Sequence, residues 1–173
     1  MTDTLWNDLD TQLVNILTDD LGPSSAYTTL QAQLVTATTY EQFLAPNTGQ
    51  RDKESQLPGI FVVGNVARYG DGQFGDGLMH LVVTTPYDIF CLAQDTSWPA
   101  ALADAKTLGT RARESLRLRP NLLYMGATPA STTGEVVRRT LIGGLDVWAL
   151  KVAGAGGLWR GLARLSVEIE AQI

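Results

Sequence analysis

Two glycine-rich segments carry a spacing that can bind phosphate groups. The segment GDGQFGDG (70–77) contains Gly-x-Gly-x-x-Gly at Gly70, Gly72 and Gly75. In a dinucleotide site this loop opens a helix whose N-terminus meets the pyrophosphate. The residues that follow here, LMHLVVTT, are instead typical of a strand. The second segment, AGAGG (153–157), lacks the Gly-Lys-Ser/Thr that completes a P-loop. Both segments are therefore predicted to be hairpin turns, and we expect no cofactor.

Few side chains are available for nucleophilic or metal chemistry. His80 is the only histidine and Cys91 the only cysteine, and Cys91 lies in the apolar run IFCL, which is typical of a buried thiol. A Ser–His–Asp or Cys–His arrangement would have to use His80, and no nucleophile-elbow sequence is present. Asp71 and Asp76 are candidate cation ligands, but no glutamate completes an EF-hand spacing. We expect neither an enzyme nor a metal site.

Arginine clusters are the most specific polar feature of the sequence. Arg and aromatic residues are enriched at the centres of protein interfaces, and the guanidinium group suits bidentate ion pairs. One interpretation is a ring of guanidinium groups that meets an acidic partner surface, such as the N-terminal segment of a neighbouring copy; the alternative is a solvated helix end. The interface candidates are the arginines and residues of the two glycine-rich turns: Arg111, Arg113, Arg117, Arg119, Arg138, Arg139, Gly72, Phe74, Gly156 and Trp159.

The first third of the chain is predicted to be helical. Apolar residues repeat at spacings of three and four over 4–20, as on one face of a helix, and Gly22-Pro23 ends the pattern. Residues 24–50 allow a second helix, although five Thr residues within 28–39 lower its propensity. The polar stretch 47–56 predicts a loop.

The rest of the chain predicts two hairpins separated by a helix. Strands over 60–69 and 78–93 flank the first glycine-rich segment, with a bulge or break at Pro86. A long helix is expected over 97–118. Its apolar stripe is Trp98, Leu102, Ala105, Leu108, Ala112 and Leu116. A second hairpin pairs 136–152 with 158–173.

The final strand alternates, with Leu165, Val167 and Ile169 on one side and Ser166, Glu168 and Glu170 on the other, which predicts one wet face. The expected fold class is α+β: one antiparallel or mixed sheet built from two hairpins, with helices packed on one face. The length of 173 residues suits a single domain, with a helical N-terminal segment and loop over 1–56 and the sheet core over 57–173.

Charge is distributed unevenly along the chain. The formal net charge of −5 arises from 13 Lys and Arg residues against 18 Asp and Glu residues. Residues 1–50 hold six of these acids and no Lys or Arg, so the remainder carries 13 basic and 12 acidic residues. Duplex DNA binding normally requires a basic excess, so we expect none. No apolar run approaches the roughly 20 residues of a membrane helix, and the N-terminus lacks a signal-peptide layout. We expect a soluble intracellular product.

The order of the expected elements resembles the tail terminator, or tail completion, proteins of long-tailed phages, of the lambda type. In that family a proline precedes the first strand, as Pro58 does here, and a polar loop leads to a second strand that runs into a helix. The chain closes with a Gly-Leu-Trp turn before an alternating strand, matched by Gly157-Leu158-Trp159 and LARLSVEIEAQI (162–173). The match in element order covers most of residues 57–173 and the first helix.

This resemblance implies a non-enzymatic structural protein of the virion neck, assembled in the host cytoplasm. It would form a homo-oligomeric ring, expected to be a hexamer. The ring would bind the last ring of major tail tube subunits, stop polymerisation and present a surface for the head-completion protein. DNA would cross the lumen without specific binding, and no membrane partner is implied. The alternatives are another neck or connector subunit, such as a head-closure or tail-tube adaptor protein, and a small-ligand-binding or enzymatic α+β domain.

Overall fold

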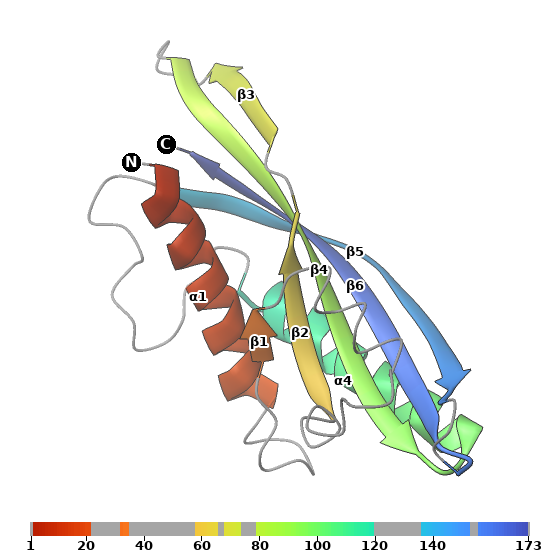
Figure 1. Ribbon diagram of the computed structural model, residues 1–173. Coiled ribbons are helices and arrows are strands. Elements are labelled where there is room, and N and C mark those ends of the chain that lie inside the picture. The colour runs from red at the N-terminus through yellow and green to blue at the C-terminus, as the bar shows by residue number, and fades with distance from the viewer. Residues whose placement is uncertain are drawn as a thin grey trace.

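The structure is a computed structural model that describes residues 2–21, 32–34, 58–65, 68–73, 79–119, 136–152 and 156–172. These residues form one six-stranded sheet and two helices (Figure 1). The helices are α1 (Thr2–Leu21) and α4 (Trp98–Arg117). The strands are β1 (Ala32–Leu34), β2 (Gly59–Gly64), β3 (Arg68–Gln73), β4 (Met79–Asp95), β5 (Val136–Lys151) and β6 (Trp159–Gln172).

The strand order is β1-β2-β4-β6-β5, and β3 pairs with β4. The β1–β2 pair is parallel and all other pairs are antiparallel. The sheet is therefore mixed, and the predicted α+β class is confirmed.

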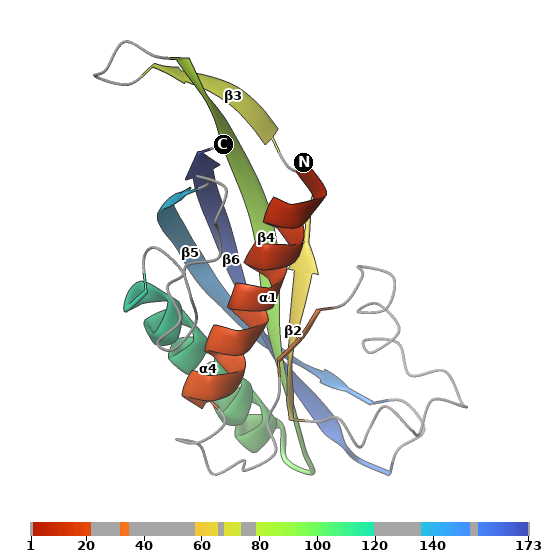
Figure 2. The same ribbon diagram turned by 90° about the vertical axis from the view of Figure 1, so that its left-hand side faces the viewer.

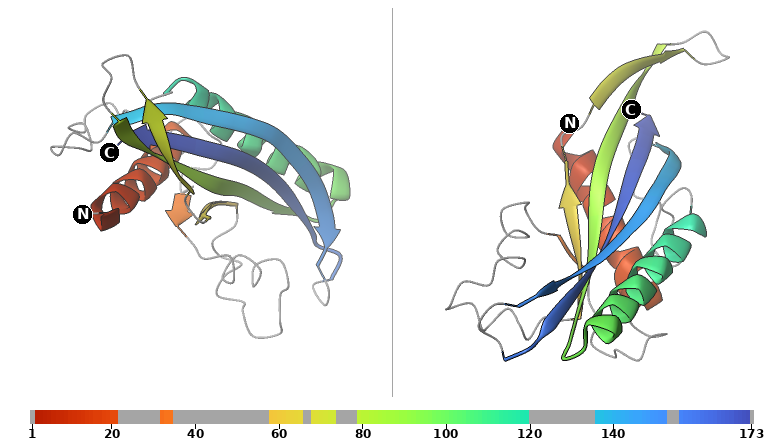
Figure 3. Two further views of the ribbon diagram at one scale, coloured as in Figure 1. Left: turned by 90° about the horizontal axis from the view of Figure 1, so that it is seen from above. Right: turned by 90° about the vertical axis from the view of Figure 1, so that its right-hand side faces the viewer.

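Both helices pack on the same face of the sheet, which we call the helix face (Figures 2 and 3). Helix α1 lies against β1 and β2, α4 lies against β4, β5 and β6, and the two helices contact each other. The main core lies between these layers. It contains the apolar stripe predicted for the first helix, here Leu9, Leu13, Ile16 and Leu17, each at most 2% exposed. Burial of such a stripe against a sheet explains why this segment is helical.

The first hairpin differs from the prediction in where its edge strand breaks. Strand β4 runs without interruption through Pro86, whereas the strand expected over 60–69 is divided into β2 and β3. The Asn65 N–H donates to the Pro86 carbonyl (2.9 Å), but proline has no N–H to return. The register shifts there by one residue, from Gly64 opposite Tyr87 to Arg68 opposite Thr84. The irregularity caused by Pro86 therefore lies in the neighbouring strand, between β2 and β3, as is common opposite a proline in a sheet.

The glycine-rich segment 70–77 is also only partly a turn. Residues 70–73 belong to β3 and pair with β4, with Gly72 opposite His80. Residues 74–78 lie outside the described part of the chain. Glycine composition favoured a turn along the whole segment, but pairing with β4 satisfies the backbone of its first half.

The second hairpin forms as predicted. Strands β5 and β6 pair from Val136 opposite Gln172 to Lys151 opposite Trp159, and the Val152 N–H donates to the Leu158 carbonyl (2.9 Å). Gly156 and Gly157 have φ values of 52° and 95°, conformations that glycine adopts at little cost. The register of β5 shifts at Gly143 and Gly144, between Ile142 and Leu145.

Helix α4 confirms the long predicted helix, and its buried stripe matches the prediction at Ala105, Leu108, Ala112 and Leu116 but not at Trp98 in its first turn. Trp98 is 46% exposed, and the buried positions are Ala101, Ala105, Leu108, Gly109, Ala112, Ser115 and Leu116. Gly161 of β6 explains the change, because a Cβ atom there would meet the carbonyl oxygen of Ala101. The first turn of α4 thus approaches the backbone of β6 too closely for large side chains, and small residues line the contact.

The expected second helix over 24–50 is wrong at Ala32–Leu34, which form β1 and pair in parallel with Ile60–Val62 of β2. Pairing with a neighbouring strand outweighs the weak helical propensity of this threonine-rich stretch. The rest of 24–50 and the loop expected over 47–56 lie outside the described residues, except for β1 itself.

The opposite face of the sheet, which we call the far face, carries a second, smaller apolar cluster. It consists of the buried residues Phe61, Val63, Phe90, Leu92 and Leu162, with Trp148 partly buried against them. The wet face predicted at Ser166, Glu168 and Glu170 is correct at Ser166 and Glu168, which are exposed, whereas Glu170 is half-buried. The same face becomes apolar toward the start of β6, where Leu162 is fully buried.

Candidate functional site

The arginines of α4 lie on the exposed surface of its second half. Arg117 pairs with Glu114 (Nη2–Oε2 2.9 Å), and both side chains are at least half exposed. Arg113 is exposed and has no ion-pair partner among the residues that the structure describes. Arg111 is exposed and Arg119 half-buried, and each interacts with another group of the chain. The second half of α4 is therefore a basic surface, and both interpretations remain open: a solvated helix end or a contact with an acidic partner.

The arginine pair on β5 does not join this surface. Arg139 donates from Nε to Glu170 Oε2 (2.9 Å), across β5 and β6. Glu170 alternates with the core residue Ile169, so this ion pair lies on the far face, with the sheet between it and α4. The side chain of Arg138 lies outside the described residues. The structure thus places Arg139 and the α4 arginines on opposite faces, and the single ring of guanidinium groups is not formed within one subunit.

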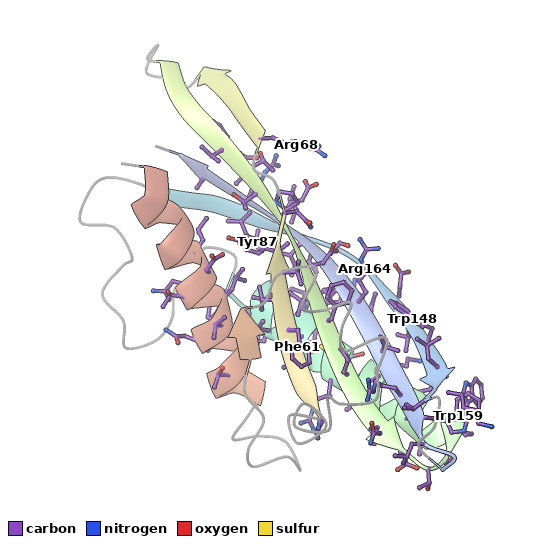
Figure 4. The ribbon with its side chains drawn as sticks, viewed as in Figure 1. Phe61, Arg68, Tyr87, Trp148, Trp159 and Arg164 are labelled. Carbon is purple, nitrogen blue, oxygen red and sulfur yellow. The ribbon has the colours of Figure 1, made fainter. Side chains whose placement is uncertain are left out.

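The candidates from the glycine-rich turns lie at opposite ends of the sheet. Gly72 is in β3, which with β4 forms an arm that extends beyond β6 at one end (Figure 1). Phe74 lies outside the described residues. Gly156 is in the β5–β6 turn at the other end. Trp159 is the first residue of β6 and is half-buried beside this turn (Figure 4). The candidates therefore mark two separate surfaces.

The residues suited to nucleophilic or metal chemistry do not converge in the described part of the chain. Cys91 is fully buried on the helix face, and burial raises the pKa of its thiol to about 12, which leaves almost no thiolate near neutral pH. The side chain of His80 is outside the described residues. No group of three or more His, Cys, Asp or Glu side chains that could hold a metal ion occurs among the residues described.

Asp88 is the centre of a polar cluster on the far face that the sequence analysis did not identify. Its Oδ1 accepts from Arg164 Nε (2.9 Å) and Ser166 Oγ (3.0 Å). Its Oδ2 accepts from Arg164 Nη2 (3.1 Å) and Asn65 Nδ2 (3.2 Å). Partial burial by itself raises the pKa of Asp88, but these hydrogen bonds and the Arg164 charge outweigh burial and lower the pKa below 3.8. The carboxylate is therefore held ionised and joins three strands.

Tyr87 is the polar anchor of the helix face. Its hydroxyl donates to Asp10 Oδ1 of α1 (2.7 Å), and its side chain is 2% exposed. Burial first, and then the hydrogen bond and charge of Asp10, raise the pKa of Tyr87 well above 10.0. The bond fixes α1 on the sheet with its donor satisfied. Asp88 and Tyr87 could have been suspected from the polar residues within the apolar run of β4, but Arg164 is 76 positions from Asp88 in sequence and Asp10 is 77 positions from Tyr87.

The sheet presents one long edge whose backbone groups have no strand partner among the described residues. Because Asn65 donates to the carbonyl of Pro86, the even-numbered residues of β4 point their backbone groups toward β2 and β3, and the odd-numbered ones toward β6. The same alternation continues across the sheet, because odd-numbered residues of β6 point their backbone groups toward β4 and even-numbered residues of β6 point them toward β5. In the second half of β5, four residues therefore direct their backbone N–H and C=O groups away from β6, toward the outer edge: Leu145, Val147, Ala149 and Lys151.

The other side of the sheet has shorter edges. Strand β1 covers Ile60–Val62 of β2, and β3 is bounded by β4 alone within the described residues. The same alternation points the backbone groups of Tyr69, Asp71 and Gln73 to the outer edge of β3. Strand edges of this kind bind other strands unless they are protected. The outer edges of β3 and β5 are therefore both candidate interfaces.

No helix in the described ranges combines the length and the apolar character that are required to cross a membrane. The sequence matches no protein-family model and no curated protein.

Proposed function

We propose that this protein is a phage tail terminator, a structural protein that forms a ring on the end of the tail tube. The ring stops polymerisation of the major tail tube protein and provides the surface to which the head-completion protein attaches. DNA passes through its lumen without specific contacts. The proposal rests first on the sequence resemblance over residues 57–173, and the α+β fold with both helices on one face agrees with it.

The observation that carries the ring itself is a pair of edges on opposite sides of one sheet that have no strand partner within the described part of the chain. The edge of β5 and the edge of β3 are different surfaces of the same chain. Contact between two different surfaces is head-to-tail, and it generates a ring when the rotation between copies closes.

The test is reconstitution with the major tail tube protein of the same phage. Tube subunits polymerised with this protein should give short tubes that carry an annulus at one end under the electron microscope. Tube subunits alone should give long tubes of variable length. Binding to a head-side connector ring with no effect on tube length would contradict tail termination and assign the protein to another position in the neck. A persistent monomer that turns over a substrate would contradict the structural role altogether.

A further inference from the structure

We propose that neighbouring copies join by adding the outer edge of β3 of one copy to the outer edge of β5 of the next, so that the sheets become continuous. This inference rests on the proposed ring and identifies the surface that closes it. The occupant of the β5 edge is a second copy of this chain.

The β5 edge carries only some of the features that keep strand edges monomeric. Natural edges are protected by prolines, charges, β-bulges or short length. Strand β5 has a register shift at Gly143 and Gly144 and an exposed Lys151 at its end, and the stretch between them is otherwise unprotected. Strand β5 is 16 residues long and contains no proline. Over residues 145–150 its only charged side chain is Asp146, and Leu150 at the end of this stretch is 43% exposed. Such an edge favours strand addition.

The arm formed by β3 and β4 would be stabilised by a strand of a neighbouring copy, for a different reason. Residues 79–81 of β4 pair with Asp71–Gln73 of β3, whereas β6 begins to pair with β4 only at Val82. This part of the arm is a two-stranded ribbon that projects from the sheet (Figures 1 and 2). Two strands by themselves are marginally stable in water, so a third strand along β3 would stabilise the arm.

Direction and side-chain orientation agree between the two edges. Strands β3 and β5 run in opposite directions within a subunit, so a head-to-tail neighbour places them antiparallel. Arg68 is opposite Thr84 in β4, which puts its exposed side chain on the far face with Asp88. Asp146 is opposite Arg164 and is exposed on the same face. The two edges thus offer one charge of each sign on the same face.

Arg68 and Asp146 also fit one register. Both point their backbone groups into their own subunit, so they would form a non-hydrogen-bonded cross-strand pair, in which side chains lie closest. Tyr69 and Leu145 would then face each other with backbone groups that both point outward. The rest of β3 would run toward Gly144 and Gly143, where the register of β5 shifts, so the contact uses the start of the 145–151 edge. Neither Arg68 nor Asp146 has an ion-pair partner among the described residues. The ion pair between copies would therefore use two charges that the fold leaves exposed.

The helices give a second electrostatic match. Helix α1 lies over the β1–β2 side and carries five Asp residues and no Lys or Arg. Helix α4 lies over the β5–β6 side and carries four basic and two acidic residues. Joining β5 to the β3 side of the next copy brings basic α4 toward acidic α1 of that neighbour. Opposite charges at an interface guide orientation and oppose the reverse docking.

The test is a charge exchange across the interface. Arg68→Asp and Asp146→Arg should each raise the concentration for half-assembly about tenfold, because each places like charges opposite one another. The double variant should assemble as the wild type does, because the ion pair is restored with its charges exchanged. An equal mixture of the two single variants should also assemble, because in a ring where the two variants alternate every contact pairs opposite charges. Sedimentation velocity and electron microscopy measure assembly, and circular dichroism checks the fold.

A backbone variant tests strand addition separately from charge. Tyr69→Pro removes a backbone N–H that points outward and should abolish assembly. Tyr69→Ala is the control: it also removes the tyrosine side chain but keeps the N–H, and it should assemble more strongly than Tyr69→Pro. Wild-type rings that cap tubes, with all variants assembling equally, would overturn this inference and leave the tail-terminator proposal standing. A wild-type chain that stays monomeric at millimolar concentration and on tail tubes would overturn both.

Discussion

Asp88 shows how one residue can determine the geometry of three strands. Its carboxylate lies on β4 and accepts hydrogen bonds from Arg164 and Ser166 of β6 and from Asn65 after β2. A carboxylate with this many donors is strongly favoured in its ionised form. The buried helix face already specifies the register of the central strands, and Asp88 adds a charge-assisted restraint on the same register from the far face.

Replacement of Asp88 by Asn should lower the free energy of unfolding by about 1–2 kcal/mol at pH 7, because two donors of Arg164 lose a charged acceptor that is partly screened by solvent. The pKa of Asp88 is lowered in the folded protein, so its contribution is present above pH 3.8 and disappears as the pH falls through the folded pKa. The difference between wild type and Asp88→Asn, measured by urea unfolding, should therefore shrink below about pH 4.

Glu168→Gln is the matched control for this experiment. Glu168 is exposed on the same face of β6, and its neutralisation should change stability by no more than about 0.5 kcal/mol. An Asp88→Asn effect that is the same at pH 7 and pH 3 would show that the lost charge is not its cause.

The packing of α4 on β6 shows how backbone proximity determines an element's sequence. Small residues face each other across this contact, with Ala101, Ala105 and Gly109 on α4 and Gly161 and Ala163 on β6. A Cβ at Gly109 would lie 2.8 Å from the Cβ of Ala163, closer than packed carbons allow. The helix can therefore lie flat on the second hairpin only because both surfaces lack bulk, and Trp98 is left at the exposed start of the helix.

Gly161→Ala should lower the free energy of unfolding by about 1–3 kcal/mol, because the new methyl group meets the carbonyl of Ala101, part of the helix backbone, and α4 must move away. Gly144→Ala is the control on the same hairpin, since a Cβ there meets nothing within 4 Å. Thermal unfolding of the two variants measures the difference. Equal melting temperatures would show that α4 can shift without cost.

At the scale of the whole molecule, charge is separated across the sheet. The acidic helix α1 covers the β1–β2 side and the basic half of α4 covers the β5–β6 side. A net charge of −5 is therefore a poor description of either surface. In a head-to-tail ring each copy would present its basic side to the acidic side of the next, and no such complementarity arises between two identical sides.

Reversal of Arg113 and Arg117 to Glu should weaken assembly by about tenfold or more at low ionic strength, with less effect at high salt, where exposed charges are screened. The fold should persist, because both side chains are exposed and the Arg117–Glu114 pair contributes at most about 0.5 kcal/mol. Lys106→Glu, an exposed reversal earlier on the same helix, is the control. Assembly that is unchanged by both reversals, with a normal circular dichroism spectrum, would remove the α4 arginines from the interface.

Most of the helices and strands could be predicted from the amino-acid sequence, because helical and strand periodicity are properties of neighbouring residues. The apolar repeat over 4–20 gave α1, the stripe after Pro99 gave α4, and the glycine turn before Trp159 gave the second hairpin. The α+β class followed from their order. These predictions required no knowledge of which strand lies beside which.

How those helices and strands pack and pair is visible in the fold alone. It divided the first predicted strand opposite Pro86, assigned Ala32–Leu34 to β1, and put Arg139 and the α4 arginines on opposite faces. It also brought Arg164 to Asp88 across 76 positions of sequence. Each of these outcomes depends on strand register, and register is set by contacts between distant residues that local patterns do not contain. The edges of β3 and β5, which have no strand partner among the residues described and on which the proposed ring depends, are likewise visible only once the strand order is known.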